Sequence, residues 1–210
     1  TVVLENDANA AALGEAVAGA GAGSRIVFYT NAGSGIGAGL VVDGRLYHGR
    51  HGGEMELGHV RLAADGGILE TLASGWALDR QVRDLMHAGT GGPLALAAAA
   101  TTPSARLLPA ALAAGDEHAW AILDAAAGHY AHALSHVVHL LNPDVIVLGG
   151  GVATLGAPWR DAVSRRLEPL LMPTMRPAPP VRLAALGQDV VPVGAALLAL
   201  QSADGEPAGG

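Results

Sequence analysis

The chain has 210 residues, of which half are hydrophobic and 30 are glycine, with no cysteine and a formal net charge of −7. That length can bury a core in one domain or two small ones. The negative charge argues against a nucleic-acid surface, which needs a basic stripe, and the lack of cysteine excludes disulfides and thiolate metal sites. Because no apolar run reaches membrane length and no signal peptide is evident, we expect a cytoplasmic protein without a membrane partner.

The start of the chain predicts a strand over residues 1–4 and a helix over the Ala-rich run 8–17, since Ala has the lowest intrinsic cost in a helix. Asn6 and Asp7 lie at the junction. One interpretation is helix capping, in which a short side-chain oxygen accepts from the N–H groups of the first turn. The other is that Asp7 points into a cleft at the carboxyl end of a strand, where open α/β sheets bind ligands.

Residues 25–30 predict the next strand, and Asp43-Gly44 between two apolar runs predicts a hairpin, because a type I′ turn needs positive φ at both central residues. Between them, residues 31–39 form a glycine-rich turn. Such a turn is either a bulged hairpin or a loop whose backbone N–H groups approach a phosphate. A strand follows the glycines and no lysine does, so the loop is neither a Rossmann fingerprint nor a Walker loop.

The loop over residues 48–62 carries Glu54, Glu56 and His59 among glycines. Such side chains are either solvated or take part in binding, but their spacing matches no closed zinc site. A helical pattern then runs from residue 68 to residue 88. Glu70 near its start suits the positive end of the helix dipole, which is the structural explanation of that residue.

The second half predicts three helices, then a strand, a glycine turn and further elements. The three helices span residues 94–100, 104–114 and 116–141. The long helix carries four histidines on one face, because their spacing is three, four and three residues. This face is either a polar or helix-contact face or a metal stripe. The four residues are His129, His132, His136 and His139. The strand 144–148 runs into three glycines and a helix over about residues 159–171, a unit suited to a nucleotide at a helix N-terminus. A strand over 181–184 and a helix over 189–201 close the chain.

Several motifs, in combination and in this order, resemble the C-terminal lobe of the ROK family (repressors, open reading frames and kinases). The motifs are Glu-Asn-Asp-Ala-Asn-Ala-Ala at 5–11, the glycine run at 33–39, Glu-Leu-Gly-His at 56–59 and, more weakly, the strand and glycines at 145–151. The resemblance extends from residue 1 to about residue 200. It implies an α/β fold, an actin-like ATPase (ribonuclease H-like) lobe with a mixed β-sheet and flanking helices. It also implies that the N-terminal lobe, which carries the first phosphate motif Asp-x-Gly-x-Thr, is missing from this chain.

The resemblance also implies roles for individual residues. Asp7 matches the catalytic base that takes a proton from a sugar hydroxyl. The residues that match sugar-hydroxyl ligands are Asn6, Glu56, His59 and Glu70. Those that match the phosphate loop are Gly33, Ser34, Gly35 and Gly37, and those that match the turn beside adenosine are Gly149, Gly150 and Gly151. The implied cofactors are ATP and Mg²⁺, and the implied substrate is a hexose or an amino sugar.

One departure from the family pattern affects the metal content. Most members carry a Cys-rich zinc element between the His and the last Glu, whereas residues 60–69 here are a short Cys-free turn, so no structural zinc is expected. We expect one lobe over residues 1–202, with a β-meander at 26–48, a mostly helical part at 70–142 and a disordered tail at 203–210.

The resulting functional hypothesis is a glucokinase- or fructokinase-like sugar kinase that forms a homodimer. The first alternative is the effector domain of a sugar-sensing repressor, and the second is a degenerate, inactive lobe. This segment contains no helix-turn-helix motif and no basic patch, so it is not expected to bind nucleic acid.

Overall fold

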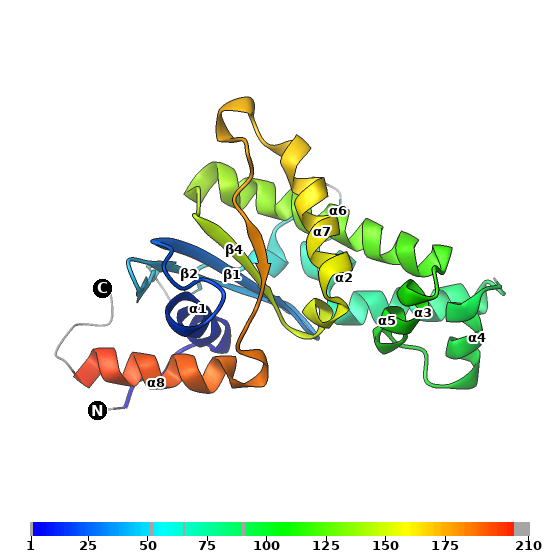
Figure 1. Cartoon of the computed structure of the whole chain (residues 1–210), viewed down its shortest axis with the longest axis horizontal. Helices are drawn as coiled ribbons and strands as arrows, with labels where there is room; N and C mark the ends of the chain where they lie inside the picture. Colours follow the sequence, from blue (N-terminus) through cyan, green and yellow to red (C-terminus); the bar gives the residue numbers. More distant parts are fainter. Residues whose placement is uncertain (1, 51–52, 65, 90, 204–210) are drawn as a thin grey trace.

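A computed structural model describes residues 2–50, 53–64, 66–89 and 91–203 (Figure 1). In this part of the chain a mixed five-stranded sheet has the order β3-β2-β1-β4-β5. Its strands are β1 Ile26–Ala32, β2 Ile36–Val42, β3 Arg45–Leu46, β4 Val145–Gly149 and β5 Val181–Leu183. β2 pairs antiparallel with β1 and β3, whereas β4 pairs parallel with β1 and β5.

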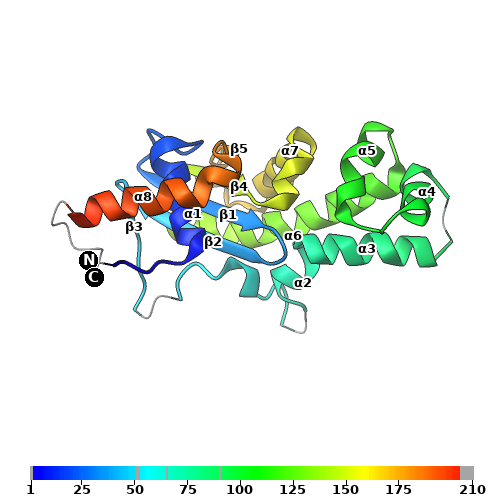
Figure 2. The same ribbon diagram turned by 90° about the horizontal axis from the view of Figure 1, so that it is seen from below.

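Helices cover both faces of the sheet. They are α1 Asp7–Ala18, α2 Leu69–Ala73, α3 Gly75–His87, α4 Pro93–Ala100, α5 Leu108–Ala113, α6 Glu117–Leu141, α7 Ala157–Leu167 and α8 Val190–Ala203. Single 3₁₀ turns lie at Leu57–His59, Ala105–Leu107, Gly151–Leu155, Glu168–Leu170, Pro173–Met175 and Gly187–Asp189. Figure 2 shows α3, α4 and α5 gathered around the N-terminal half of α6, away from α8.

The alternation of side chains along β4 builds two cores, one on each face of the sheet. Val145 and Val147 pack with α1 and α8, whereas Ile146 and Leu148 pack with α6 and α7. All four side chains are buried. This pattern confirms the sequence interpretation of a strand that is covered on both faces, and it confirms the mixed α/β fold.

The predicted meander is confirmed. β1, β2 and β3 are consecutive antiparallel strands, and Asp43 and Gly44 between the last two have φ values of 51° and 75°. These are the positive values that a type I′ turn requires. The glycine-rich turn is shorter than predicted, because β1 continues to Ala32 and β2 begins at Ile36.

The strand predicted over residues 1–4 is wrong where the structure describes it. Val2 and Leu4 are 95% and 96% exposed and have no strand geometry. A strand needs a partner for its backbone N–H and C=O groups, and none of the strands in the sheet lies beside this segment. The apolar, β-branched composition predicted a strand, but a strand forms only where such a partner is present.

The single helix predicted over 68–88 is also wrong, because the chain breaks at Ser74. Ser74 has an extended ψ of 165°, and its hydroxyl accepts from the N–H of Ala77 at 3.2 Å, which begins α3. The N–H of Gly75 donates to the carbonyl of Gly33 at 2.7 Å. The break therefore ties the start of α3 to the glycine turn between β1 and β2.

The ends of the chain differ from the predictions in smaller ways. The helix expected over about 159–171 is α7, which begins at Ala157 after a 3₁₀ turn and ends at Leu167. The tail expected over 203–210 lies outside the described residues apart from Ala203, which ends α8. The division of the chain into one lobe and a tail stays a prediction.

The long helix is confirmed as α6, and Asp116 caps it. Its carboxylate accepts from the N–H groups of His118 and Ala119, both at 2.9 Å, and from Leu94 N–H at the start of α4, also at 2.9 Å. Burial raises the pKa of Asp116, but these N–H groups outweigh it and hold the pKa below its ordinary value of 3.8. One carboxylate therefore joins the N-termini of two helices.

Asp116→Ala is expected to lower the free energy of unfolding by about 2 kcal/mol at neutral pH, because it removes caps from two helices. A lowered pKa in the folded state means that the stabilisation is present above pH 3.8 and is lost as the pH falls through that lowered pKa. Urea unfolding near neutral pH and near pH 3 measures the difference between variant and parent. The difference should shrink at the lower pH, and a constant difference would contradict the role of the charge.

Candidate functional site

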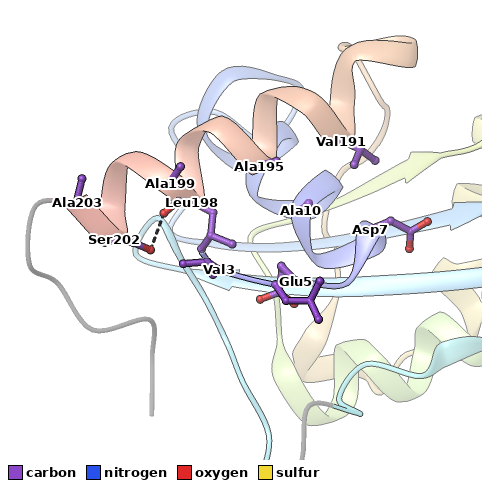
Figure 3. Close-up of a pocket in the computed structure, with 11 residues that line it drawn as sticks. Val3, Glu5, Asp7, Ala10, Val191, Ala195, Leu198, Ala199, Ser202 and Ala203 are labelled. Atoms are coloured by element: carbon purple, nitrogen blue, oxygen red, sulfur yellow. Dashed lines mark hydrogen bonds between the residues drawn. The ribbon is translucent and has the colours of Figure 1, made fainter. Parts of the chain in front are cut away.

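The first turn of α1 holds Asn6 and Asp7. Asn6 is the N-cap residue, and its Oδ1 accepts from the N–H of Ala8 at 2.7 Å. Capping is therefore confirmed for Asn6. Asp7 is the first helical residue, and its side chain is exposed. Figure 3 shows the Asp7 carboxylate pointing away from α8, beside an apolar groove of about 450 Å³ between the N-terminal segment and α8. A carboxylate at this end of a helix lies in the favourable field of the helix dipole.

A small recess of about 30 Å³ brings the N-cap of α1 next to the loop before the 3₁₀ turn. Its lining includes Asn6 and Asn9 from the start of α1, Gly37 from β2, and both Glu54 and Glu56 from the loop. Asn6 and Glu56, which are far apart in sequence, are thus neighbours in space. Glu56 is exposed, so its carboxylate is accessible to a ligand.

Glu70 lies in the first turn of α2, against the glycine turn of the meander. Its Oε2 accepts from the N–H of Ile36 at 2.8 Å. A Cβ atom on Gly35 would lie 2.5 Å from this oxygen, and one on Gly58 would lie 3.4 Å from it. Gly58 is the neighbour of His59, whose side chain is exposed. The structure therefore places Glu70 beside the Glu56–His59 segment and gives it a structural hydrogen bond as well.

Another hollow, of about 380 Å³, lies at the start of the glycine turn. Gly33, Ser34 and Gly151 line it, so the phosphate-loop candidates and one of the adenosine-side candidates meet there. Its volume lies within the range of about 300–1,000 Å³ that is usual for small-molecule sites. No atom lies within 4 Å of a Cβ built on Gly33, so this part of the turn borders open space.

Sequence reasoning missed four polar or aromatic residues of this cavity. They are Trp76, Asp79, Arg106 and Thr154. Trp76 is 67% exposed, and an Asp79 oxygen accepts from the N–H of Ala105 at 2.6 Å, which fixes the segment that carries Arg106. No local motif marks these residues, because Trp76 fits the apolar pattern of a helix, and Arg106 and Thr154 come from segments far away in the sequence.

The other glycines that the sequence marks as phosphate-loop or adenosine-side candidates lie where strands pack closely. A Cβ atom on Gly149 would overlap the Tyr29 hydroxyl, and one on Gly150 would lie 2.5 Å from the carbonyl oxygen of Ala32. Gly150 also has a φ of 79°, which L side chains rarely adopt. Gly37 lies next to Asn31, whose Oδ1 accepts from its N–H at 3.0 Å. Gly149 and Gly150 thus permit the close approach of β4 to β1.

The histidine face of α6 is a polar surface. His132, His136 and His139 are exposed, and the ring centroids of the first two lie 5.2 Å apart. The Nε2 of His139 accepts from the N–H of Met172 at 3.2 Å, which is a contact between segments. Within the described residues no three His, Asp or Glu side chains converge as a metal site. The same part of the chain has no helix long and apolar enough to cross a membrane.

The sheet order, the flanking helices and the polar sites at the glycine turn define an actin-like α/β lobe. The chain belongs to the ROK family, whose model matches residues 1–202. It is 31% identical to a glucokinase of Halalkalibacterium halodurans over 95% of this chain and 64% of that protein. The chain thus spans less than two thirds of the length of that relative.

Two solved structures show the range of the likeness. A ROK family glucokinase from Streptomyces griseus, in complex with glucose and AMPPNP, is 30% identical with a TM-score of 0.81. The match covers 95% of this chain and 68% of that one. A ROK family transcriptional regulator, a homolog of the E. coli MLC protein, is 28% identical with a TM-score of 0.86, covering 96% of this chain and 52% of that one.

Proposed function

We propose that this chain forms the sugar-binding and nucleotide-binding part of an ATP-dependent hexose kinase. The observation that carries the proposal is the position of the glycine turn. Glu70 contacts Gly35 and Ile36 of this turn, and Gly33 and Ser34 of the same turn line the 380 Å³ cavity. Phosphoryl transfer requires the acceptor and the donor to meet at one point, mainly by positioning. In the proposed enzyme, the glycine turn would lie where the acceptor site and the donor site meet.

On the sugar side, Asn6, Glu56, His59 and Glu70 would hold the hydroxyl groups. A carboxylate accepts hydrogen bonds from hydroxyls with charge-assisted strength, so Glu56 and Glu70 favour a ring with several hydroxyls. Asp7 would accept the proton of the attacking hydroxyl. A carboxylate suffices as the base, because the proton leaves late in a loose transition state.

On the nucleotide side, the cavity would take a nucleoside triphosphate, since its volume of about 380 Å³ is usual for a small-molecule site. Gly33 and Ser34 would lie along the phosphates, Gly151 beside the nucleoside, and Trp76 and Arg106 offer a stacking surface and a positive charge. Gly35, Gly37, Gly149 and Gly150 would keep the turn and the strand ends close enough for this arrangement. Mg²⁺ would be held chiefly by the phosphates and water, as is usual for this ion, and would neutralise their developing charge.

The alternative function is that of a sugar-sensing repressor domain. The likeness to the ROK family transcriptional regulator, with a TM-score of 0.86, supports it. In that function, this lobe would bind a sugar without phosphorylating it. We also propose that the protein acts in the cytoplasm, where ATP is available, and as a homodimer. The absence of structural zinc stays a prediction.

A coupled assay of ADP release tests the proposal on the natural polypeptide that contains this sequence, with ATP, Mg²⁺ and a panel of glucose, fructose, mannose and N-acetylmannosamine. Hexose-dependent ADP release is the expected result. Quenching of Trp76 fluorescence by AMPPNP, absent in Trp76→Phe, would locate the nucleotide. Sugar binding in a calorimeter without turnover would favour the repressor, and no heat with any sugar would favour an inactive lobe.

A further inference from the structure

The Glu54 carboxylate is buried, whereas Glu56, two residues further on, is exposed. The Glu54 side chain is only 4% exposed. One oxygen accepts from the Asn9 amide at 3.0 Å and lies 3.2 Å from Nδ1 of His48, and the other accepts from Gly49 N–H at 3.2 Å. Burial raises the pKa of Glu54, but hydrogen bonds from its own backbone N–H and from Asn9, Gly49 and His48 outweigh it and lower the pKa below its usual range. The carboxylate is therefore held in its charged form by named partners on two segments.

A second carboxylate completes the cluster. Glu5 accepts from the same Asn9 amide at 2.9 Å and lies 3.5 Å from Nε2 of His48. It also accepts from the backbone N–H of Asn6 at 2.8 Å. Because a primary amide has two N–H groups, Asn9 can serve both carboxylates at once. The cluster of Glu5, Asn9, His48 and Glu54 thus joins the segment before Asp7, the first turn of α1 and the loop before Glu56.

The backbone between Glu54 and Glu56 explains how one carboxylate is buried and the other exposed. Met55 has a φ of 59°, a left-handed conformation that costs energy for a residue with a Cβ atom. Such a conformation persists only where the surrounding structure holds the residues on both sides of it in place. Glu54 provides the anchor on one side, and Leu57, which is 4% exposed, provides it on the other. The turn at Met55 then directs Glu56 outward.

We propose that Glu54 is a positioning residue, which locks Glu56 against Asn6 in the geometry that hexose recognition requires. The inference rests on the proposed function. Glu54, Asn6, Asn9 and Glu56 line the same small recess, so a shift of the Glu54 anchor moves Glu56 relative to the N-cap of α1. Recognition of hydroxyls is sensitive to such shifts, because a hydrogen bond weakens steeply when its distance and angle leave the favourable range.

The test uses the natural polypeptide that contains this sequence. Glu54→Ala is expected to raise the KM for the hexose about tenfold, with kcat within about threefold and the KM for ATP unchanged, because only sugar positioning is lost. Glu54→Gln retains an oxygen for Asn9 and should restore most of the hexose affinity. If Glu54→Gln and Glu54→Ala have the same hexose KM, the hydrogen bonds to Glu54 do not position the sugar site.

Two controls separate positioning from loss of stability. Glu168→Ala removes another carboxylate, one that accepts from Ala178 N–H at 2.8 Å in a distant segment, and should leave the hexose KM unchanged. The double variant of Asn9→Ala and Glu54→Ala should raise the hexose KM by less than the product of the two single effects, because the two residues share one hydrogen bond. A hexose KM raised equally by Glu168→Ala would show that Glu54 contributes stability alone.

Hydrogen exchange of the amides of residues 53–60 distinguishes failure of this inference from failure of the proposed function. Exchange in Glu54→Ala should be faster than in the parent, with no change at residues 157–167. If the parent phosphorylates hexoses but the variant changes neither exchange nor KM, the inference alone is wrong. If the parent phosphorylates no hexose, the proposed function fails and the positioning role fails with it.

Discussion

Asp7→Asn is expected to lower kcat for hexose phosphorylation by about 10²- to 10⁴-fold, the range over which a general base contributes. Asparagine has nearly the same shape as aspartate but cannot take up the hydroxyl proton. Asp7 is the exposed first residue of α1, whereas Asn6 makes the capping hydrogen bond to Ala8. The fold therefore does not depend on the Asp7 carboxylate, and hexose affinity should stay within about threefold.

The measurement compares kcat with the dissociation constant for the hexose in the natural polypeptide that contains this sequence. Asn6→Ala is the matched control, because it removes the neighbouring cap and should lower the free energy of unfolding by about 1 kcal/mol. Asp7→Asn should lower the free energy of unfolding by less than Asn6→Ala does, because it loses only the interaction of the carboxylate with the helix dipole. Full turnover in Asp7→Asn would show that another group takes the proton.

Glu15→Ala is expected to have the largest effect on stability, a loss of about 4 kcal/mol in the free energy of unfolding. Glu15 is completely buried, and its carboxylate accepts from Ala20 N–H at 2.7 Å, Ala185 N–H at 2.9 Å and Leu186 N–H at 2.8 Å. Alanine would leave these donors without an acceptor. It would also release the end of α1 from the segment that leads into α8.

Chemical unfolding monitored by circular dichroism measures this loss. Glu15→Gln is the control, since its single amide oxygen can serve some of the same N–H groups, and its loss should be clearly smaller than that of alanine. Glu168→Ala, which removes one hydrogen bond to Ala178 N–H near the surface, should cost about 1 kcal/mol. If Glu15→Ala were as mild as Glu168→Ala, the buried carboxylate would not join α1 to α8.

The sequence predicted helices and strands well where they depend on residues that are close together in the chain. The Asp43-Gly44 hairpin, the Asp116 cap of α6 and the apolar strand β4 all follow from residues within a few positions of one another. The prediction failed where a distant partner decides. Residues 2–4 form no strand because no strand of the sheet lies beside them, and the helix after residue 68 breaks at Ser74 as the chain meets Gly33.

The site shows the same division. The motifs at Asn6-Asp7, the glycine turn and Glu56–His59 were visible in the sequence, and they led to the ROK family that the family model confirms. Their joint arrangement was not visible, because Asn6 and Glu56 are far apart in sequence and line one recess only in the folded chain. Trp76 and Arg106 join Gly33 in one cavity although three separate segments carry them.

By itself, the sequence determined the class of fold, the family and the identity of the polar residues, because these depend on composition, periodicity and the order of short motifs. Only the tertiary structure decided which oxygens are already committed within the protein. The Glu70 carboxylate accepts a hydrogen bond from Ile36 N–H, and Glu54 is hydrogen-bonded to Asn9 and His48. Asp7, in contrast, is exposed. A side chain's hydrogen-bond partners come from segments that only the packed sheet and helices bring together.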